Sequence, residues 1–140
     1  MTQKKNMHPM CHEHPAIPVL DGVINKLALP LSLATKAAGL VFVSGLPPLD
    51  VATGDLITGT IEEQTSACMR ALSHVLHHSG SSLERATMLR IYATNTGHYE
   101  RINRVYQTFF QSGFPSRTFV PVASWPMPFD LEIECIATSI

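Results

Sequence analysis

The sequence predicts an α+β fold in which one mixed β-sheet carries two helices on the same face. Short runs of apolar and β-branched residues indicate strands. Two longer stretches with apolar residues at every third or fourth position indicate helices. The predicted order is strand, strand, helix, strand, helix, strand, strand. Because 140 residues suit one domain with a modest core, we expect both helices to pack on a single sheet.

The N-terminal part begins with a polar, proline-rich stretch. We expect residues 1–20 to be a flexible leader, followed by a single domain over residues 21–140. Weak patterns at 23–27 and 31–37 predict short extended pieces. The first clear strand is 39–45, Gly-Leu-Val-Phe-Val-Ser-Gly, which is apolar, β-branched and bounded by glycines.

Two helices are predicted from their termini and their apolar stripes. Residues 60–63, Thr-Ile-Glu-Glu, form a capping box that begins the first helix, and Gly80 ends it. The second helix is expected from about 98 to 111, before Gly113 and Pro115. The stripes are Ile61, Thr65, Cys68, Met69, Leu72, Val75 and Leu76 in the first helix, and Tyr99, Ile102, Tyr106, Phe109 and Phe110 in the second.

Three further strands are predicted at 85–94, 116–124 and 130–138. Alternate side chains of a strand point to opposite faces. We expect one face to meet the helices through Thr118, Val120, Val122, Leu131, Ile133, Cys135 and Ala137. The other face would carry Arg90, Tyr92, Arg117, Phe119, Glu132 and Glu134. This second face is too apolar to be fully exposed to solvent and too polar to be a hydrophobic core. We therefore expect it to form a contact between subunits, with pockets at the subunit interfaces.

Arg117 and Glu132 are the candidate functional pair. If their strands pair, a guanidinium and a carboxylate line one pocket, where the first binds an anion and the second handles water or a proton. The alternative is a structural ion pair on the sheet. Glu134, on the same predicted face as Glu132, is a second candidate for the water-handling role.

Composition narrows the class of partner. The net charge is −1 and no basic run is present, so nucleic acid is not expected as a partner. The low share of charged residues, 15%, is a weak indication of an oligomer. Three widely spaced cysteines do not make a disulfide framework. With no long apolar run and no signal-peptide pattern, we expect no membrane association and a cytoplasmic location.

Two groups of histidines are candidate metal sites. Residues 8–14, His-Pro-Met-Cys-His-Glu-His, match no closed zinc pattern, and no second cluster completes them. His74, His77 and His78 fall near the end of the first helix, where positive charge is favoured. We expect no metal site in either group.

Several motifs occur in an order that resembles the Rid family, the reactive-intermediate deaminases. The similarity runs from about residue 25 to the end of the chain. Each motif alone is weak, and their succession is specific. The matching segments are 39–45 with Pro47, 53–54, 61–64, 80–83, 103–106 with Phe109 and Phe110, 115–117 and 131–137.

This resemblance implies a chorismate-mutase-like fold and a homotrimer whose sites lie between subunits. It implies hydrolysis of an enamine or imine, with an imino or enamino acid as the small-molecule substrate and a 2-keto acid and ammonia as products. No cofactor is implied. Arg117 matches the family's substrate-binding arginine, Glu132 its water-positioning glutamate and Asn103 its helix asparagine, while Ser44 and Gly45 match the loop that lines its pocket.

Some positions depart from the family pattern. Leu31 stands where a tyrosine is frequent, Phe119 where a cysteine is common and Leu46 where a glutamine is usual, and residues 125–128, Trp-Pro-Met-Pro, replace a commoner Leu-Pro. These changes predict a pocket for a bulkier or more apolar substrate than 2-aminoacrylate. The alternative is a non-catalytic trimer that binds a small carboxylate or a protein, or a ribonuclease-like or translation-inhibiting role as in some family members.

Overall fold

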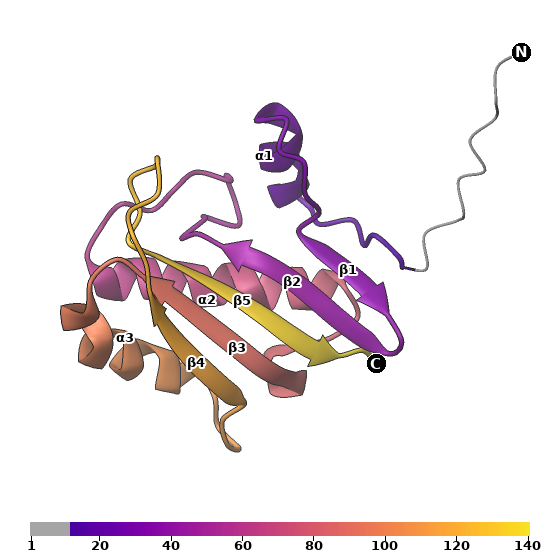
Figure 1. Cartoon of the computed structure of the whole chain (residues 1–140). Helices are drawn as coiled ribbons and strands as arrows, with labels where there is room; N and C mark the ends of the chain where they lie inside the picture. Colours follow the sequence, from indigo (N-terminus) through magenta and orange to yellow (C-terminus); the bar gives the residue numbers. More distant parts are fainter. Residues whose placement is uncertain (1–11) are drawn as a thin grey trace, which may run out of the picture.

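A computed structural model describes residues 12–140 and has an α+β architecture with one five-stranded sheet (Figure 1). The expected α+β class is therefore confirmed. The strands lie in the order β1-β2-β5-β3-β4. All pairs are antiparallel except β3 with β4, which is parallel. The elements are α1 (Leu20–Lys26), β1 (Ala34–Ala37), β2 (Leu40–Leu46), α2 (Ile61–His78), β3 (Ala86–Ala93), α3 (Tyr99–Tyr106), β4 (Ser116–Pro121) and β5 (Leu131–Thr138), with 3-10 turns at Leu83–Arg85, Thr96–His98 and Gln107–Phe109.

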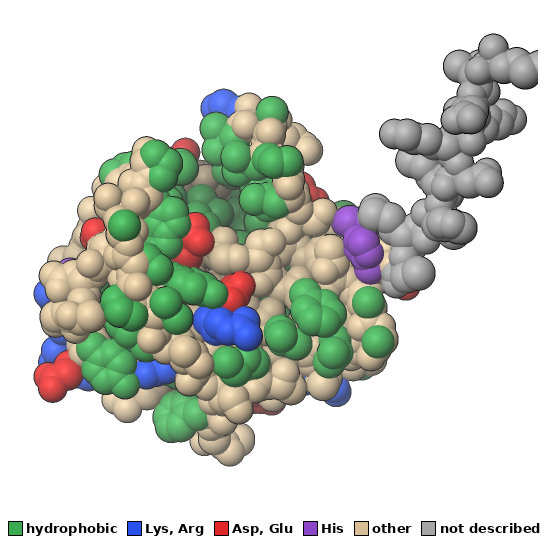
Figure 2. Space-filling model, viewed as in Figure 1, with side chains coloured by type: hydrophobic (Ala, Val, Ile, Leu, Met, Phe, Trp, Pro, Cys, Tyr) green, Lys and Arg blue, Asp and Glu red, His purple; other side chains and the backbone are tan. Residues whose placement is uncertain are grey.

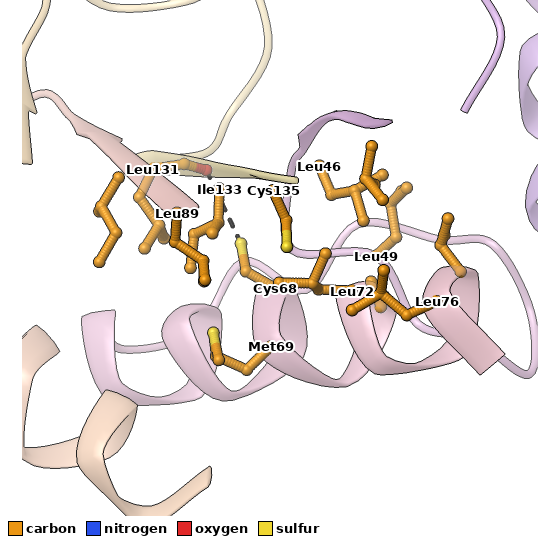
Figure 3. Packing of buried hydrophobic residues seen from close by; sticks show 14 of the residues in the cluster. Leu46, Leu49, Cys68, Met69, Leu72, Leu76, Leu89, Leu131, Ile133 and Cys135 are labelled. Atoms are coloured by element: carbon orange, nitrogen blue, oxygen red, sulfur yellow. Dashed lines mark hydrogen bonds between the residues drawn. The ribbon is translucent and has the colours of Figure 1, made fainter. Parts of the chain in front are cut away.

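The helices α2 and α3 lie behind the sheet in Figure 1, and no helix of the described residues covers its front face. The stripe of α2 packs on β2 and β5, and Leu72, Leu89 and Ile133 are fully buried there (Figure 3). The thiol of Cys68 donates a weak hydrogen bond to the carbonyl of Leu131 at 3.9 Å. This contact ties the middle of α2 to the first residue of β5.

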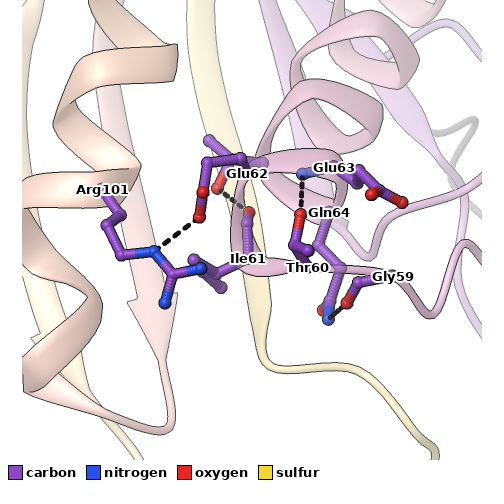
Figure 4. A network of polar contacts seen from close by, with 8 residues as sticks. Gly59, Thr60, Ile61, Glu62, Glu63, Gln64 and Arg101 are labelled. Atoms are coloured by element: carbon purple, nitrogen blue, oxygen red, sulfur yellow. Dashed lines mark hydrogen bonds and ion pairs between the residues drawn. The ribbon is translucent and has the colours of Figure 1, made fainter.

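The start of α2 is held by polar contacts (Figure 4). The hydroxyl of Thr60 accepts a hydrogen bond from the backbone N–H of Glu63 at 3.2 Å, as the capping motif predicts. The buried amide of Gln64 donates to the carboxylate of Asp130 and accepts from the Asp130 backbone N–H, each at 2.9 Å. Gln64 thus fixes the chain just before β5, two residues from Glu132.

The first part of the chain differs from expectation. Residues 23–27 are mostly helical in α1 rather than extended. The expected leader also ends before residue 20, because Glu13 bridges to Lys36 of β1 and the side chains of Ile17 and Leu20 lie in the core. Prolines interrupt this apolar stretch, Pro-Ala-Ile-Pro-Val-Leu at 15–20, so it shows no helix or strand periodicity. Residues 1–11, including His8, lie outside the described part.

The assignment of faces is right for β3 and β5 and wrong for β4. Leu131, Ile133, Cys135 and Ala137 are buried under the helices, and Glu132 and Glu134 are on the open face. In β4, however, Arg117 is paired with Leu89 and Phe119 with Ile91. Paired residues share a face, so Arg117 and Phe119 lie on the helix side. Thr118 and Val120 lie on the open face instead. The polarity of β4 did not indicate its buried face. Arg117 lies on the helix side because its side chain packs against the aromatic rings of α3.

Candidate active site

Glu132 projects from the open face of β5, in the middle of the sheet. Its side chain is half-buried. Burial, and secondarily the neighbouring charge of Glu134, raise the pKa of Glu132 to about 7. Among residues 12–140, no hydrogen-bond donor lies within reach of its carboxylate. Such a carboxylate can accept a proton near neutral pH.

Glu134, the second candidate, is engaged in a structural network. Its carboxylate accepts hydrogen bonds from the Arg90 guanidinium at 3.0 Å and from the Tyr92 hydroxyl at 2.5 Å. The carboxylate of Glu134 also raises the pKa of Tyr92 by accepting that bond. The ion pair expected as an alternative on this face therefore forms, but between Arg90 and Glu134. Glu132 is the carboxylate left to meet a ligand.

Gly45 allows Glu132 to occupy its position. A Cβ atom at residue 45 would lie 2.6 Å from Oε2 of Glu132, closer than a carbon and an oxygen can approach. Next to it, the hydroxyl of Ser44 donates a hydrogen bond to the backbone carbonyl of Ser32 at 2.7 Å. Ser44 therefore links β2 to the segment before β1, and the glycine gives space to the carboxylate.

Arg117 lies at the β4 edge of the sheet, between β4 and α3. Its guanidinium donates to Oδ1 of Asn103 at 2.7 Å and to the Tyr99 hydroxyl at 3.4 Å. It also lies 4.9 Å from the centre of the Tyr106 ring, within cation–π range. Arg117 and Asn103 line a cavity of about 320 Å³ together with Phe114. This positive group, partly exposed and held by neutral partners, can bind an anion.

The structure does not bring Arg117 and Glu132 of one chain together. They lie on opposite faces of the sheet, and β3 separates their strands. A pocket that uses both residues must therefore combine two copies of the chain. Phe119 packs edge-on against Tyr99, with ring centres 5.0 Å apart, and so lies with Arg117 rather than Glu132.

Leu31 lies on the Glu132 side. It lines a cavity of about 640 Å³ with Gly45 and Glu132. Most of the wall is apolar and comes from α1, the segments around residues 29–33 and 47–56, and the loop before β5. The departure from the family pattern at residues 125–128 lies in this wall. The sequence does not predict α1 as a part of the site, because the pattern of its residues is weak.

The histidines described by the structure do not assemble a metal site. The His12 and His14 rings pack together, and His14 bonds the Ser32 hydroxyl at 2.9 Å. His74 bonds the backbone carbonyl of Pro18 at 2.9 Å. Within residues 12–140, no three metal-ligating side chains converge. No helix in that range is long and apolar enough to cross a membrane.

Comparison with known proteins places these residues in a family context. Residues 24–139 match the family model described as Endoribonuclease L-PSP. Reactive Intermediate Deaminase A, chloroplastic, from Arabidopsis thaliana is 32% identical over 109 residues, covering 78% of this chain and 58% of its own length.

Solved structures share the fold. One from Entamoeba histolytica, named for the same L-PSP family, superimposes with a TM-score of 0.82 at 30% identity, covering 91% of this chain and 98% of the other. E. coli TdcF, solved with bound serine, gives a TM-score of 0.73 at 27% identity, covering 79% and 88%.

Proposed function

The chain belongs to the Rid/YjgF/L-PSP family, and we propose that it hydrolyses 2-imino acids, and the enamines that convert to them, to 2-keto acids and ammonia. The observation that carries this proposal is Glu132, a half-buried carboxylate without a protein partner in residues 12–140 and with a pKa of about 7. A base with this pKa is matched to proton transfer at neutral pH.

We place the active site between subunits of a homotrimer. Two facts support this arrangement: Arg117 and Glu132 lie on opposite faces of the sheet of one chain, and no helix within residues 12–140 covers the front face of that sheet (Figure 1). An exposed sheet face with Phe42 on it, 39% exposed, suits contact with a second copy. Arg117 of one copy then faces Glu132 of the next across the bound substrate.

Arg117, Asn103 and Glu132 have separate roles in the proposed reaction. Arg117 forms a two-bonded pair with the substrate carboxylate, and Asn103 holds the guanidinium in place. Glu132 takes a proton from water while the water oxygen bonds to the imine carbon, and the imine nitrogen receives a proton from the solvent. In the resulting carbinolamine, protonated Glu132 gives its proton to the nitrogen, and the C–N bond breaks with its electron pair leaving on the nitrogen as ammonia. The hydroxyl proton is released to the solvent as the carbon becomes a ketone, so the Glu132 carboxylate and the proton balance are restored.

The arrangement also supports a substrate that is bulkier or more apolar than 2-aminoacrylate. Leu31, which replaces a tyrosine frequent in the family, is 45% exposed and lies in the cavity beside Glu132. Phe119 packs against Tyr99 on the Arg117 side, so in this arrangement it belongs to the half of the site that the neighbouring copy supplies. We retain the cytoplasm as the proposed location.

Binding without turnover is the second candidate function. The Arg117 cavity is complete within one chain, so it can hold a carboxylate without Glu132. TdcF, a relative of the same fold, was solved with bound serine. A binding protein of this kind would not depend on the carboxylate of Glu132.

One experiment separates the two functions. An imino acid is generated in situ from an amino acid by an amino-acid oxidase, and its loss is followed with and without the protein. The proposal predicts faster ammonia release with wild-type protein and a large loss of rate with Glu132→Gln, while keto-acid binding persists. Equal rates with and without wild-type protein would leave only binding.

A further inference from the structure

We propose that the cavity beneath α1 receives the apolar side chain of the substrate, so that the preferred substrates are 2-imino acids with branched or aromatic side chains. This inference rests on the proposed function for its chemistry. The predicted preference among substrates is argued from the cavity alone.

The cavity has the size and lining of a binding site. It measures about 640 Å³ and is larger than the Arg117 cavity, within the range of cavities that hold small molecules. Figure 2 shows the hollow beneath α1 with hydrophobic side chains around it. Its lining is mostly apolar, and Glu132 and Asp55 supply its carboxylates. An apolar group is therefore the ligand that this wall fits.

Exposed apolar side chains gather at this cavity. Large hydrophobic side chains are costly to expose to water when they cluster. Five such residues, each at least 40% exposed, line this one cavity: Val19, Leu27, Leu29, Leu31 and Met127. A bound apolar group would remove much of their surface from water.

The polar end of the cavity orients the ligand. Glu132 lies on its wall next to Gly45, so the reacting carbon must lie near the carboxylate. The side chain attached to that carbon then points toward α1, and the substrate carboxylate points outward to Arg117 of the neighbouring copy. The single tryptophan of the chain, Trp125, also lines the cavity.

Part of the wall lies before the range that the family model matches. The family model matches from residue 24, whereas α1 begins at Leu20. Val19, Gly22 and Val23, which line the cavity, precede that match. The segment is anchored firmly, because Leu20 is fully buried and the backbone N–H of Ile17 donates to the Asp21 carboxylate at 2.7 Å. The structure thus provides a fixed wall for selecting substrates.

The first test measures selectivity. Imino acids generated from alanine, leucine and phenylalanine are compared by kcat/KM for ammonia release. We expect the leucine and phenylalanine products to be preferred over the alanine product by about tenfold or more, from burial of the added carbons. Leu29→Ser should reduce that preference several-fold and Leu29→Trp should abolish it by filling the cavity. Ile140→Ser, a change at an 84% exposed residue outside the cavity, is the matched control and should change nothing.

The second test needs no catalysis. In a titration, 4-methyl-2-oxopentanoate should change the fluorescence of Trp125 at a lower concentration than pyruvate does. Leu29→Trp should weaken the binding of 4-methyl-2-oxopentanoate but not that of pyruvate, as measured by calorimetry. Turnover with a preference for the alanine product would overturn the cavity inference and leave the proposed function standing. Absence of turnover, with the larger keto acid still bound more tightly, would overturn the function and support the cavity. Equal binding of both keto acids would overturn the cavity inference.

Discussion

Gly45→Ala should damage catalysis far more than stability. The added Cβ would lie 2.6 Å from Oε2 of Glu132, and the next atoms of that side chain are 3.5 Å or more away. The overlap is therefore confined to the flexible end of Glu132, which must move by roughly an ångström. A displacement of that size at a reacting group costs about 10²-fold in rate.

The effect on stability should be small. Gly45 does not have the positive φ that excludes alanine, unlike Gly39 and Gly54. Replacing glycine at a compatible position restricts the unfolded chain and contributes about 0.4–1 kcal/mol of stability. This gain offsets part of the cost of moving the carboxylate, so we expect a net change within about 1 kcal/mol.

A matched control is available at Gly59, where a Cβ would overlap the carboxylate of Glu63 outside the site. The assay compares kcat/KM for ammonia release and the urea midpoint of both variants at one protein concentration. Gly59→Ala should retain activity. The reasoning is refuted if Gly45→Ala keeps wild-type activity, or if both variants lose activity in proportion to stability.

Three further predictions concern binding, pH and the core. Arg117→Lys should lower kcat/KM on the order of 10²-fold, because an ammonium cannot form the two-bonded pair with a carboxylate; an unchanged value would remove Arg117 from the site. The kcat/KM of the wild-type protein should fall as pH drops below about 7, because Glu132 gains a proton there. Glu132→Gln should lose most of the rate, and its remaining kcat/KM should not show this fall. If the variant shows the same fall at low pH, the fall belongs to a group other than Glu132. Leu72→Ala, which empties a fully buried position under the sheet, should lower the free energy of unfolding by about 2–5 kcal/mol in urea denaturation, and a loss below about 1 kcal/mol would contradict the packing described.

The elements with strong periodicity could be predicted from the sequence. The helix α2 has a capping residue, a continuous apolar stripe and a terminating glycine. The alternation in β5 is equally clear, and its buried residues are the ones predicted. α3 was predicted too long, because its last apolar turn, Gln107–Phe109, is a 3-10 turn.

The face of β4 could not be predicted in the same way. Its sequence mixes polar and apolar residues on both faces, and its parallel register with β3 decides which side meets α3. The cavity could not be predicted from the sequence either, because its walls come from segments that are separated by about a hundred residues of chain. Gly45 and Glu132 were both identified, but their contact depends on the pairing of β2 with β5.

Mixed assemblies test the shared site most directly. Arg117→Ala and Glu132→Gln copies, each inactive alone, are unfolded together in equal amounts and refolded. If every site takes its arginine from one copy and its glutamate from the next, about one quarter of the sites in random assemblies receive both intact groups. We therefore predict that the mixture regains about a quarter of wild-type activity. Activity no higher than that of the two variants refolded separately would contradict an active site built from two copies.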